Sequence, residues 1–500
     1  MAKEIIVNAT AEENRVAVLN NNKIEEFYVE RTSAKRLVGS VYKGRVESIM
    51  AGIGAAFVNI GLEKNGFLYV DDIIEEGSPY IDLLDEEMDD EHRKKDRNTP
   101  PPKITDILKK GQEISVQVVK EPLGTKGARL TAHISLPGRY LVFMAHDTHK
   151  GISKKISDPK ERKRLKAIID EINLPNNVGI IVRTAAVNHT KDELKREAVY
   201  LYNLYRHVEK IASRKSAPSL IHEEYGLIQR IARDNLTEDV NFMIIDSKQE
   251  YKKTHVLLRM MSPKIRSKLK LHNSPQPIFE KFNIASEIER IFDRRVSLPS
   301  KGYIIIEPTE GLVVIDVNTG SFAGKSPEDT TYITNREAAV EIARQLKLRD
   351  IGGIIVVDFI DMDSKDHRQS VLQALLNALK NDKARTKVLN FSQIGLVEMT
   401  RQRMRKSLEG VSYNTCPYCG GRGTVKSLVT MSIEVIRLLE KRLKAERYKK
   451  VQVTLNANLK DYILQNYKKA LELLGRNSRC NIIVNGEAHL HVEDVRVNIG

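Results

Sequence analysis

Two aspartates stand directly after apolar runs in the segment from Gly302 to Thr400. Asp316 ends LVVID and is followed by Asn318, and Asp358 ends GGIIVVD and is followed by Asp361. Ligands gather beyond the carboxyl ends of strands in α/β sheets, so two such carboxylates on neighbouring strands could share one Mg²⁺. Asn318 could then orient Asp316 or a metal-bound water. The alternative is that each Asp ends its strand by capping a turn or a helix.

The string CPYCGGRG contains a second candidate metal site. It holds Cys416 and Cys419, and the glycines after them leave room for backbone amides near thiolate sulfur. A structural Zn²⁺ needs four ligands, and this chain has one such pair. A second copy of the chain could supply the other pair, giving one zinc per dimer; Cys480 and a distant His are the alternative ligands. A redox role needs a helix to begin after the first Cys, which the glycines oppose.

Five strand-like runs lie between Val41 and His133: VYKGRVES, AAFVNI, GFLYV, ISVQVV and ARLTAHI. They fit a small OB-type barrel, with Phe57 and Phe67 on its second and third strands. Bases stack on exposed rings at that face of OB folds, and Lys43 adds positive charge nearby. The alternative is that both rings fill the barrel core. An acidic stretch followed by a basic one over residues 77–103 is expected to be a loop insertion.

An arginine interrupts the apolar run IVRTAAV, which we predict to be a strand. Arg183, with the hydroxyl of Thr184 beside it, suits the capture of a phosphate group. The alternative is an ion pair with a nearby carboxylate.

The elements around the two aspartates alternate between strand and helix. The strands YIIIE, LVVIDV and GGIIVVDF are nearly all apolar, so we expect a mixed sheet with both faces buried. Helices are expected over 327–348 and 365–381. The N-terminal strands EIIVNAT and RVAVLNNNKIEEFYV are too short to bury a core and must pair with a later segment.

The whole chain reads as a multidomain basic protein. Its 500 residues carry a formal net charge of +15, with 41% hydrophobic and 29% charged residues. These values exclude a disordered or fibrous chain and favour a polyanionic partner, although a basic surface can also serve solubility alone. The sequence has no membrane-spanning apolar run and no secretory signal, and its three cysteines favour a reducing cytoplasm.

Together, these motifs resemble the ribonuclease E/G family of bacterial endoribonucleases. The strings that carry the resemblance are YKGRVESI, AAFVNIG, ISLPGRYLV, IVRTAA, VIDVNTG, EIARQLKLRDIGGIIVVDFIDM and CPYCGGRG. The resemblance implies a Mg²⁺-dependent endoribonuclease that cuts single-stranded RNA, is stimulated by a 5′-monophosphate and acts in rRNA and tRNA maturation and mRNA decay. The rival function is a non-catalytic RNA-binding protein with a structural zinc.

The resemblance also assigns roles to individual residues. Asp316, Asn318, Asp358 and Arg385 match the catalytic residues, the two acids as magnesium ligands. Phe57, Phe67 and Lys126 match RNA contacts of the OB-type domain. Gly138, Val142, Arg183 and Thr184 match a pocket that senses the 5′-monophosphate. Cys416 and Cys419 match zinc ligands shared between two protomers of a homodimer, which could pair further into a tetramer.

The implied architecture is a multidomain α/β and α+β chain. It joins residues 1–38 and 229–293 as an RNase H-like subdomain, with the OB fold (39–131) and the 5′-sensor (132–228) inserted. A DNase I-like catalytic subdomain (294–412), a zinc-link (413–425) and a small dimerisation domain (426–500) follow. The chain ends at Gly500 without a long tail, which resembles the short, ribonuclease G-like form and argues against scaffolding and membrane tethering. Natural RNA substrates cannot be predicted from the sequence.

Overall fold

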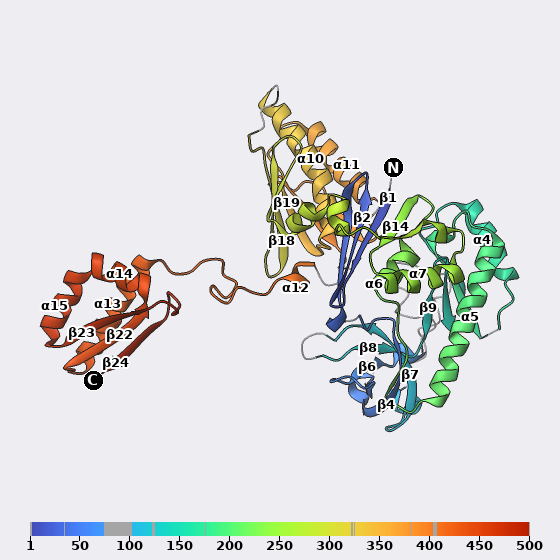
Figure 1. The fold of residues 1–500 in the computed structure, drawn as a ribbon, viewed down its shortest axis with the longest axis horizontal. Helices are drawn as coiled ribbons and strands as arrows, with labels where there is room; N and C mark the ends of the chain where they lie inside the picture. The colour runs from blue at the N-terminus through green and yellow to red at the C-terminus, as the bar shows by residue number, and fades with distance from the viewer. Residues whose placement is uncertain are drawn as a thin grey trace. The chain divides into compact units, whose positions relative to one another are not determined.

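The computed structural model describes residues 3–34, 36–74, 103–122, 126–175, 177–321, 324, 326–380, 382–403 and 408–499. The chain divides into two compact units, Met1–Val411 and Ser412–Gly500, which Figure 1 draws as ribbons. Of the loop insertion expected over 77–103, all but Lys103 lies outside the described residues.

The N-terminal strands complete a sheet with a much later segment. The five-stranded sheet has the order β15-β14-β1-β2-β3. Its strands are Lys3–Ala9 (β1), Glu13–Asn20 (β2), Lys23–Arg31 (β3), Val240–Ile245 (β14) and Leu269–Leu271 (β15). β1 runs parallel to β14, with Ile5 opposite Met243. The helices of this region are Leu227–Asp234 (α6), Lys248–Met261 (α7), Ile278–Lys281 (α8) and Ala285–Glu289 (α9).

The five strands predicted between Val41 and His133 form an OB-like barrel. They are Val41–Met50 (β4), Ala55–Asn59 (β5), Gly66–Tyr69 (β6), Glu113–Lys120 (β7) and Arg129–Thr131 (β8). The order β4-β5-β6-β8-β7 closes on itself because β4 also pairs with β7. A further strand, Ser219–His222 (β13), pairs with β4 from outside the barrel. Two short helices, Asp71–Ile74 (α1) and Ile104–Ile107 (α3), accompany it.

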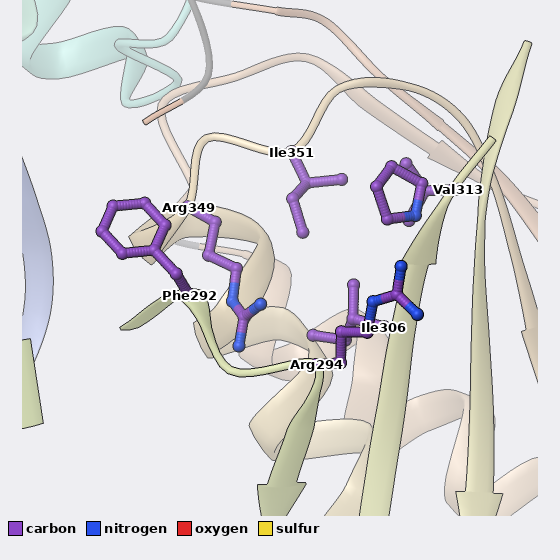
Figure 2. Close-up of a pocket in the computed structure, with 7 residues that line it drawn as sticks. Phe292, Arg294, Ile306, Val313, Arg349 and Ile351 are labelled. Carbon is purple, nitrogen blue, oxygen red and sulfur yellow. The ribbon is translucent and has the colours of Figure 1, made fainter. Parts of the chain in front are cut away.

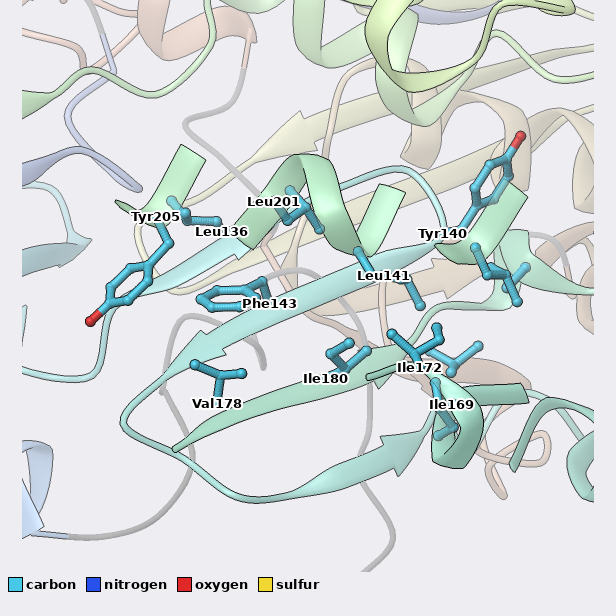
Figure 3. Close-up of a cluster of buried hydrophobic side chains, with 14 of the residues drawn as sticks. Leu136, Tyr140, Leu141, Phe143, Ile169, Ile172, Val178, Ile180, Leu201 and Tyr205 are labelled. Atoms are coloured by element: carbon cyan, nitrogen blue, oxygen red, sulfur yellow. The ribbon is translucent and has the colours of Figure 1, made fainter. Parts of the chain in front are cut away.

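The next region has a four-stranded sheet covered by two helices. The strands are Ser135–Pro137 (β9), Leu141–Ala145 (β10), Lys150–Ile152 (β11) and Val178–Val182 (β12), and the helices are Pro159–Glu171 (α4) and Lys191–Arg214 (α5). Phe143 and Ile180 of the sheet pack with Ile169 and Leu201 of the helices, as Figure 3 shows. The strand predicted across IVRTAAV is shorter than expected: β12 ends at Val182, and Thr184–Ala186 forms a 3-10 turn.

A six-stranded mixed sheet carries the two aspartates. Its strands are Arg295–Ser297 (β16), Tyr303–Pro308 (β17), Leu312–Asn318 (β18), Gly353–Asp358 (β19), Thr386–Val388 (β20) and Leu396–Arg401 (β21), in the order β16-β17-β18-β19-β21-β20. Its two long helices are Pro327–Leu348 (α10) and Lys365–Leu379 (α11).

The expectation that both faces of this sheet are buried is wrong. Burial alternates along β18, and Ile315 is fully buried while its neighbours are only partly so. α10 and α11 lie together on one side of the sheet in Figure 1, where both contribute to the core that surrounds Ile315. The other face keeps apolar side chains partly in solvent, and Ile354 is 53% exposed. An apolar run therefore did not distinguish a strand buried on two faces from one buried on a single face.

The second unit is a small α/β domain. Its elements are Leu428–Ala445 (α13), Lys450–Asn456 (β22), Ala457–Asn466 (α14), Lys468–Ser478 (α15), Asn481–Glu487 (β23) and Val495–Ile499 (β24); Leu408–Ser412 (α12) spans the boundary between the units. The three strands pair in the order β23-β22-β24. Across the described parts of the chain, no helix is long and apolar enough to span a bilayer.

Candidate functional site

The mixed sheet places Asp316 and Asp358 side by side. β18 and β19 run parallel, and the two aspartates stand opposite each other at the carboxyl ends of these strands. Residues in this register point to the same face of a sheet, here the face opposite the buried Ile315. Asn318 lies on that face too, and its Nδ2 donates a hydrogen bond to Asp316 Oδ2 over 2.7 Å. The prediction that the two acids lie on neighbouring strands is confirmed; Asp358 ends β19, whereas β18 continues past Asp316 to Asn318.

The two carboxylates suit a hard cation. Asp358 is exposed and Asp316 is half-buried. Within the described residues, neither carboxylate has an ion-pair partner. Mg²⁺ binds through one or two carboxylates and completes its shell with water and phosphate oxygens. No cluster of three or more His, Cys, Asp or Glu side chains that could hold a metal is found in the described residues. Two carboxylates at one edge suit a cation that leaves most of its shell to water and substrate.

A buried amide that the sequence analysis missed holds the loop after Asp358. Asn335, in the middle of α10, is fully buried. Its Nδ2 donates to the carbonyl of Ile360 over 2.8 Å, and its Oδ1 accepts from the Ile360 N–H over 3.1 Å. Asn335 thus holds both the N–H and the carbonyl of Ile360, which lies two residues beyond Asp358. An Asn on the apolar side of a predicted helix is the sequence signal that could have found it.

Arg385 does not lie beside the acids. It immediately precedes β20, where Thr386 stands opposite Arg401, and Arg401 stands opposite Gly353 at the start of β19. Asp358 is at the other end of β19, about 17 Å along the strand at roughly 3.3 Å per residue. Arg385 is exposed. The structure therefore places Arg385 near the end of the sheet opposite the two acids, and its role as a catalytic residue stays a prediction.

A small pocket also opens at the end of the sheet away from the acids. Its volume is about 40 Å³, and it is lined by Phe292, Arg294, Ile306, Pro308, Val313, Arg349 and Ile351. Figure 2 shows these side chains around the start of β18. A cavity of this size holds only a few water molecules, so it is not the site of a reaction on a polymer.

The barrel presents its two phenylalanines on its outer surface. Phe57 and Phe67 stand opposite each other on β5 and β6, with ring centroids 4.6 Å apart, and both are half-buried. Their neighbours Val58 and Leu68 point inward and are fully buried. Neither ring is therefore part of the closed core, and both remain available for stacking. Lys126 is exposed and lies two residues before Ala128, whose carbonyl accepts the N–H of Phe67 over 2.7 Å.

Lys43 lies elsewhere on the barrel. Its Nζ makes an ion pair with Glu113 at 3.0 Å and donates to the carbonyl of Lys215 at 2.9 Å. The Lys43 hydrogen bond, followed by those from the Ala217 N–H and Arg45, lowers the pKa of Glu113 to about 2. Both partners line an open groove of about 1190 Å³ between the barrel and α5. The structure therefore separates Lys43 from the Phe57 and Phe67 pair.

The predicted phosphate pocket is built around the turn between β9 and β10. Arg183 follows the last residue of β12, and its Nη1 donates to the carbonyl of Gly138 over 2.6 Å and to Asp234 Oδ1 over 2.8 Å. Arg183 thus makes the ion pair considered as the alternative, with Asp234. It also contacts Gly138, which the resemblance places in the phosphate pocket. Thr184 begins the 3-10 turn beside Arg183. Val142 is fully buried with Met144 and Ile181, so its side chain can shape the pocket only by packing.

A buried glutamate of α5 shapes this turn, and the sequence analysis did not identify it. Glu197 is fully buried and accepts the N–H groups of Arg139, Tyr140 and Leu141 over 2.6, 2.7 and 2.9 Å. A Cβ on Gly138 would lie 2.7 Å from the Glu197 carboxyl carbon, so only glycine fits there. Burial raises the pKa of Glu197 to about 7, although the hydrogen bonds from the three N–H groups favour the charged carboxylate and lower this pKa. Glu197 follows a mostly charged run, KDELKR, so the sequence gives little signal of this role.

The CPYC segment forms a tight turn and is not the start of a helix. Cys416 is exposed, Cys419 is half-buried, and the next helix, α13, begins only at Leu428. The N–H of Gly423 donates to Cys419 Sγ over 3.3 Å, and this bond, with that from the Gly421 N–H, lowers the pKa of the Cys419 thiol. Gly420, Gly421 and Gly423 have φ angles of 57°, 85° and 74°, which glycine adopts without strain.

This geometry fits a thiolate metal ligand because the amides stabilise charged sulfur before any metal binds. Cys480, by contrast, is buried in the core of the small domain, and burial raises the pKa of its thiol.

Comparison with known proteins shows which family this chain belongs to. A model of the Ribonuclease E/G family matches residues 135–404, and a model of the RNase E/G thioredoxin-like domain matches residues 415–499. The chain is 42% identical to ribonuclease G of Escherichia coli K12 over 441 residues, covering 87% of each chain. Ribonuclease G of Haemophilus influenzae has the same identity and coverage. Ribonuclease E of E. coli K12 is 36% identical over 505 residues, which cover 99% of this chain but 46% of that protein. The chain belongs to the ribonuclease E/G family.

Proposed function

We propose that this chain is a Mg²⁺-dependent endoribonuclease that hydrolyses single-stranded RNA and leaves a 5′-phosphate and a 3′-hydroxyl. The observation that carries the proposal is the pairing of Asp316 with Asp358 at one edge of the mixed sheet, with Asn318 bonded to Asp316. The rival function, RNA binding without cleavage, shares the barrel and the positive charge but gives these side chains no task.

The roles of the residues follow from their positions. Mg²⁺, when bound, supplies an activated water and offsets the charge that develops on the scissile phosphate. Asp316 and Asp358 would hold it. Asn318 restrains the carboxylate of Asp316 through one oxygen, which leaves the other oxygen for the cation. Asn335 keeps the backbone after Asp358 in place, so the end of β19 that presents the second carboxylate is held in position.

RNA recognition is proposed to rest mainly on stacking and charge. Phe57 and Phe67 offer partly exposed rings to unpaired bases, which favours single strands because every base has a π-face. Lys126 lies near the same face, and the net charge of +15 attracts a polyanion. Stacking on an aromatic ring does not distinguish one base from another, so we expect weak sequence preference. As for the ribonucleases E and G that it resembles, the proposed cellular tasks are rRNA and tRNA maturation and mRNA decay in the cytoplasm.

The turn between β9 and β10 is proposed to sense the 5′ end of the RNA. Arg183 is anchored there by Gly138 and Asp234, and the pKa of Asp234 is held well below its usual range by Arg233 and Arg183 in spite of its burial. The anchored guanidinium and the Thr184 hydroxyl would recognise a terminal monophosphate.

The remaining architecture is proposed by resemblance. The five-stranded sheet of β1 and β14 corresponds to the RNase H-like subdomain, and the mixed sheet corresponds to the DNase I-like catalytic subdomain. Cys416 and Cys419 would bind one Zn²⁺ jointly with the same residues of a second chain, giving a homodimer that could pair into a tetramer.

Substitution of the two acids tests the catalytic proposal. Asp316→Asn or Asp358→Asn should reduce Mg²⁺-dependent cleavage of a short 5′-monophosphorylated RNA by at least about 100-fold, while RNA affinity changes little. Glu310→Gln is the matched control, since Glu310 is an exposed acid at the opposite end of the same sheet. Wild-type-like cleavage by either Asn variant would refute the assignment, and a wild type that binds RNA but never cuts it would favour the rival function.

A further inference from the structure

We infer that His491 and Glu493 are positioning residues that hold the CPYC turn in its metal-binding shape. The inference rests on the proposed zinc site and adds to it two residues that are distant from the cysteines in sequence. Both lie between β23 and β24 of the small domain, and both contact the turn directly.

His491 fixes the middle of the turn. Its Nε2 lies 2.5 Å from the carbonyl oxygen of Tyr418, and its Nδ1 accepts the N–H of Glu493 over 3.1 Å. Because Nδ1 accepts, Nε2 carries the hydrogen and donates to Tyr418. The two rings also pack with their centroids 4.2 Å apart. The carbonyl of Tyr418 belongs to the peptide that enters Cys419, so this contact restrains the direction in which the Cys419 side chain leaves the backbone.

Glu493 fixes the exit of the turn. Its Oε2 accepts from Arg422 Nη2 over 2.9 Å, and its Oε1 accepts from the N–H of Lys426 over 2.8 Å. Arg422 reaches back in turn, because its Nε donates to the carbonyl of Cys419 over 3.2 Å. The chain is thus held on both sides of Cys419 by one short segment of the folded domain.

These contacts have a consequence for metal affinity. A flexible CPYC loop would lose conformational entropy on binding zinc, whereas a turn already held in shape loses less. Groups that orient metal ligands without touching the metal typically change affinity by about 10- to 100-fold when removed. His491 and Glu493 therefore make tight metal binding depend on the folding of the whole small domain, and not on the CPYC segment alone.

The test is a Co²⁺ titration of the full chain followed by competition with Zn²⁺. Tetrahedral thiolate coordination gives Co²⁺ a characteristic visible absorption, which reports ligand geometry independently of RNA cleavage. His491→Phe keeps the ring but removes both hydrogen bonds, and Glu493→Gln removes the ion pair with Arg422. His489→Phe is the matched control, since His489 is a largely exposed histidine of the same segment.

We expect His491→Phe and Glu493→Gln to weaken metal affinity about 10-fold or more, with unchanged stoichiometry at saturation. Wild-type affinity in both variants would overturn the inference while leaving the zinc proposal intact. A wild type without the thiolate spectrum would overturn the zinc proposal itself. If His491→Phe alone unfolds the domain, as seen by circular dichroism, Glu493→Gln decides between these results.

Discussion

Arg183 separates recognition of the RNA 5′ end from the chemistry of cleavage. Its guanidinium is tied to Gly138 and Asp234, far along the chain from Asp316 and Asp358. We predict that Arg183→Ala removes most of the preference for a 5′-monophosphate over a 5′-hydroxyl. The check is kcat/KM on a matched pair of RNAs that differ only at the 5′ end.

A circular RNA of the same sequence serves as the control for Arg183. It has no 5′ end to sense, so its cleavage by Arg183→Ala should stay within about twofold of wild type. Equal losses on the linear and circular substrates would show instead that Arg183 acts through folding, by leaving Asp234 without one of its two cationic partners.

The sequence predicted where some of the functional residues lie in the fold but not where others lie. Asp316 and Asp358 could be placed because each follows a strand-length apolar run, which predicts an edge where ligands gather. Arg385 could not be placed, because its distance from the acids depends on how β20 pairs with β21. Glu197 was missed since its partners are backbone groups, which leave no trace in residue types, whereas Asn335 could have been noticed as an Asn on the apolar side of a predicted helix.

At the scale of elements, the outer face of β5 and β6 should bind bases without supporting the barrel. Phe57→Ala and Phe67→Ala should each weaken binding of single-stranded RNA by about 1–3 kcal/mol, the usual value of stacking on an aromatic ring. Their effect on thermal stability should be smaller than that of truncating a fully buried barrel residue, because both rings keep part of their surface in solvent. Fluorescence anisotropy with an unstructured RNA measures the first quantity.

Val58→Ala is the informative control for this face. Val58 lies beside Phe57 but is fully buried in the barrel, so its truncation should lower the melting temperature and affect RNA binding less. If the Phe variants lose as much stability as Val58→Ala and no RNA affinity, the rings are structural.

The support that α5 gives to the β9–β10 turn should depend on pH. The pKa of Glu197 is about 7 in the folded protein against an ordinary 4.5, so between these values the folded chain keeps a proton that the unfolded chain has lost. The stability from this group is present below pH 4.5 and is lost as pH rises to about 7, by up to about 3 kcal/mol.

Glu197→Gln cannot titrate, so wild type should lose stability relative to this variant between pH 5 and 7.5. Melting temperatures across that range measure the difference. Glu171→Gln, at an exposed position of α4, should show no such trend. A constant difference between wild type and Glu197→Gln would contradict the raised pKa.

Element prediction succeeded where pattern and length agreed. The five barrel strands and α10 were predicted from short strand-like runs and from a long helical segment between two strands. It failed where burial depends on what packs from outside: the apolar β18 is covered on one face only, since α10 and α11 share the same side. The end of β12 was also misplaced, because Thr184–Ala186 forms a 3-10 turn in place of further strand.

At the scale of the molecule, the zinc proposal predicts a metal-linked dimer. Four thiolates from two chains give about 0.5 zinc per chain, and replacing Cys416 and Cys419 with serine should abolish the dimer and weaken cleavage. Cys480→Ser should leave metal content unchanged, because Cys480 lies in the core of the small domain. Metal analysis combined with light scattering measures both quantities; one zinc per chain, or a stable metal-free dimer, would refute the shared site.

The pairing of β1 with β14 has a consequence for synthesis on the ribosome. Ile5 cannot meet Met243 until the barrel and the region of α4 and α5 have been made. At about 5–20 residues per second, the first strands wait roughly 10–50 s for their partner. During that interval the apolar side chains of β1 to β3 have no sheet to complete, which exposes the nascent chain to chaperones. A slow stretch of codons before residue 240 would prolong this exposure, whereas the barrel, whose strands are close in sequence, could fold meanwhile.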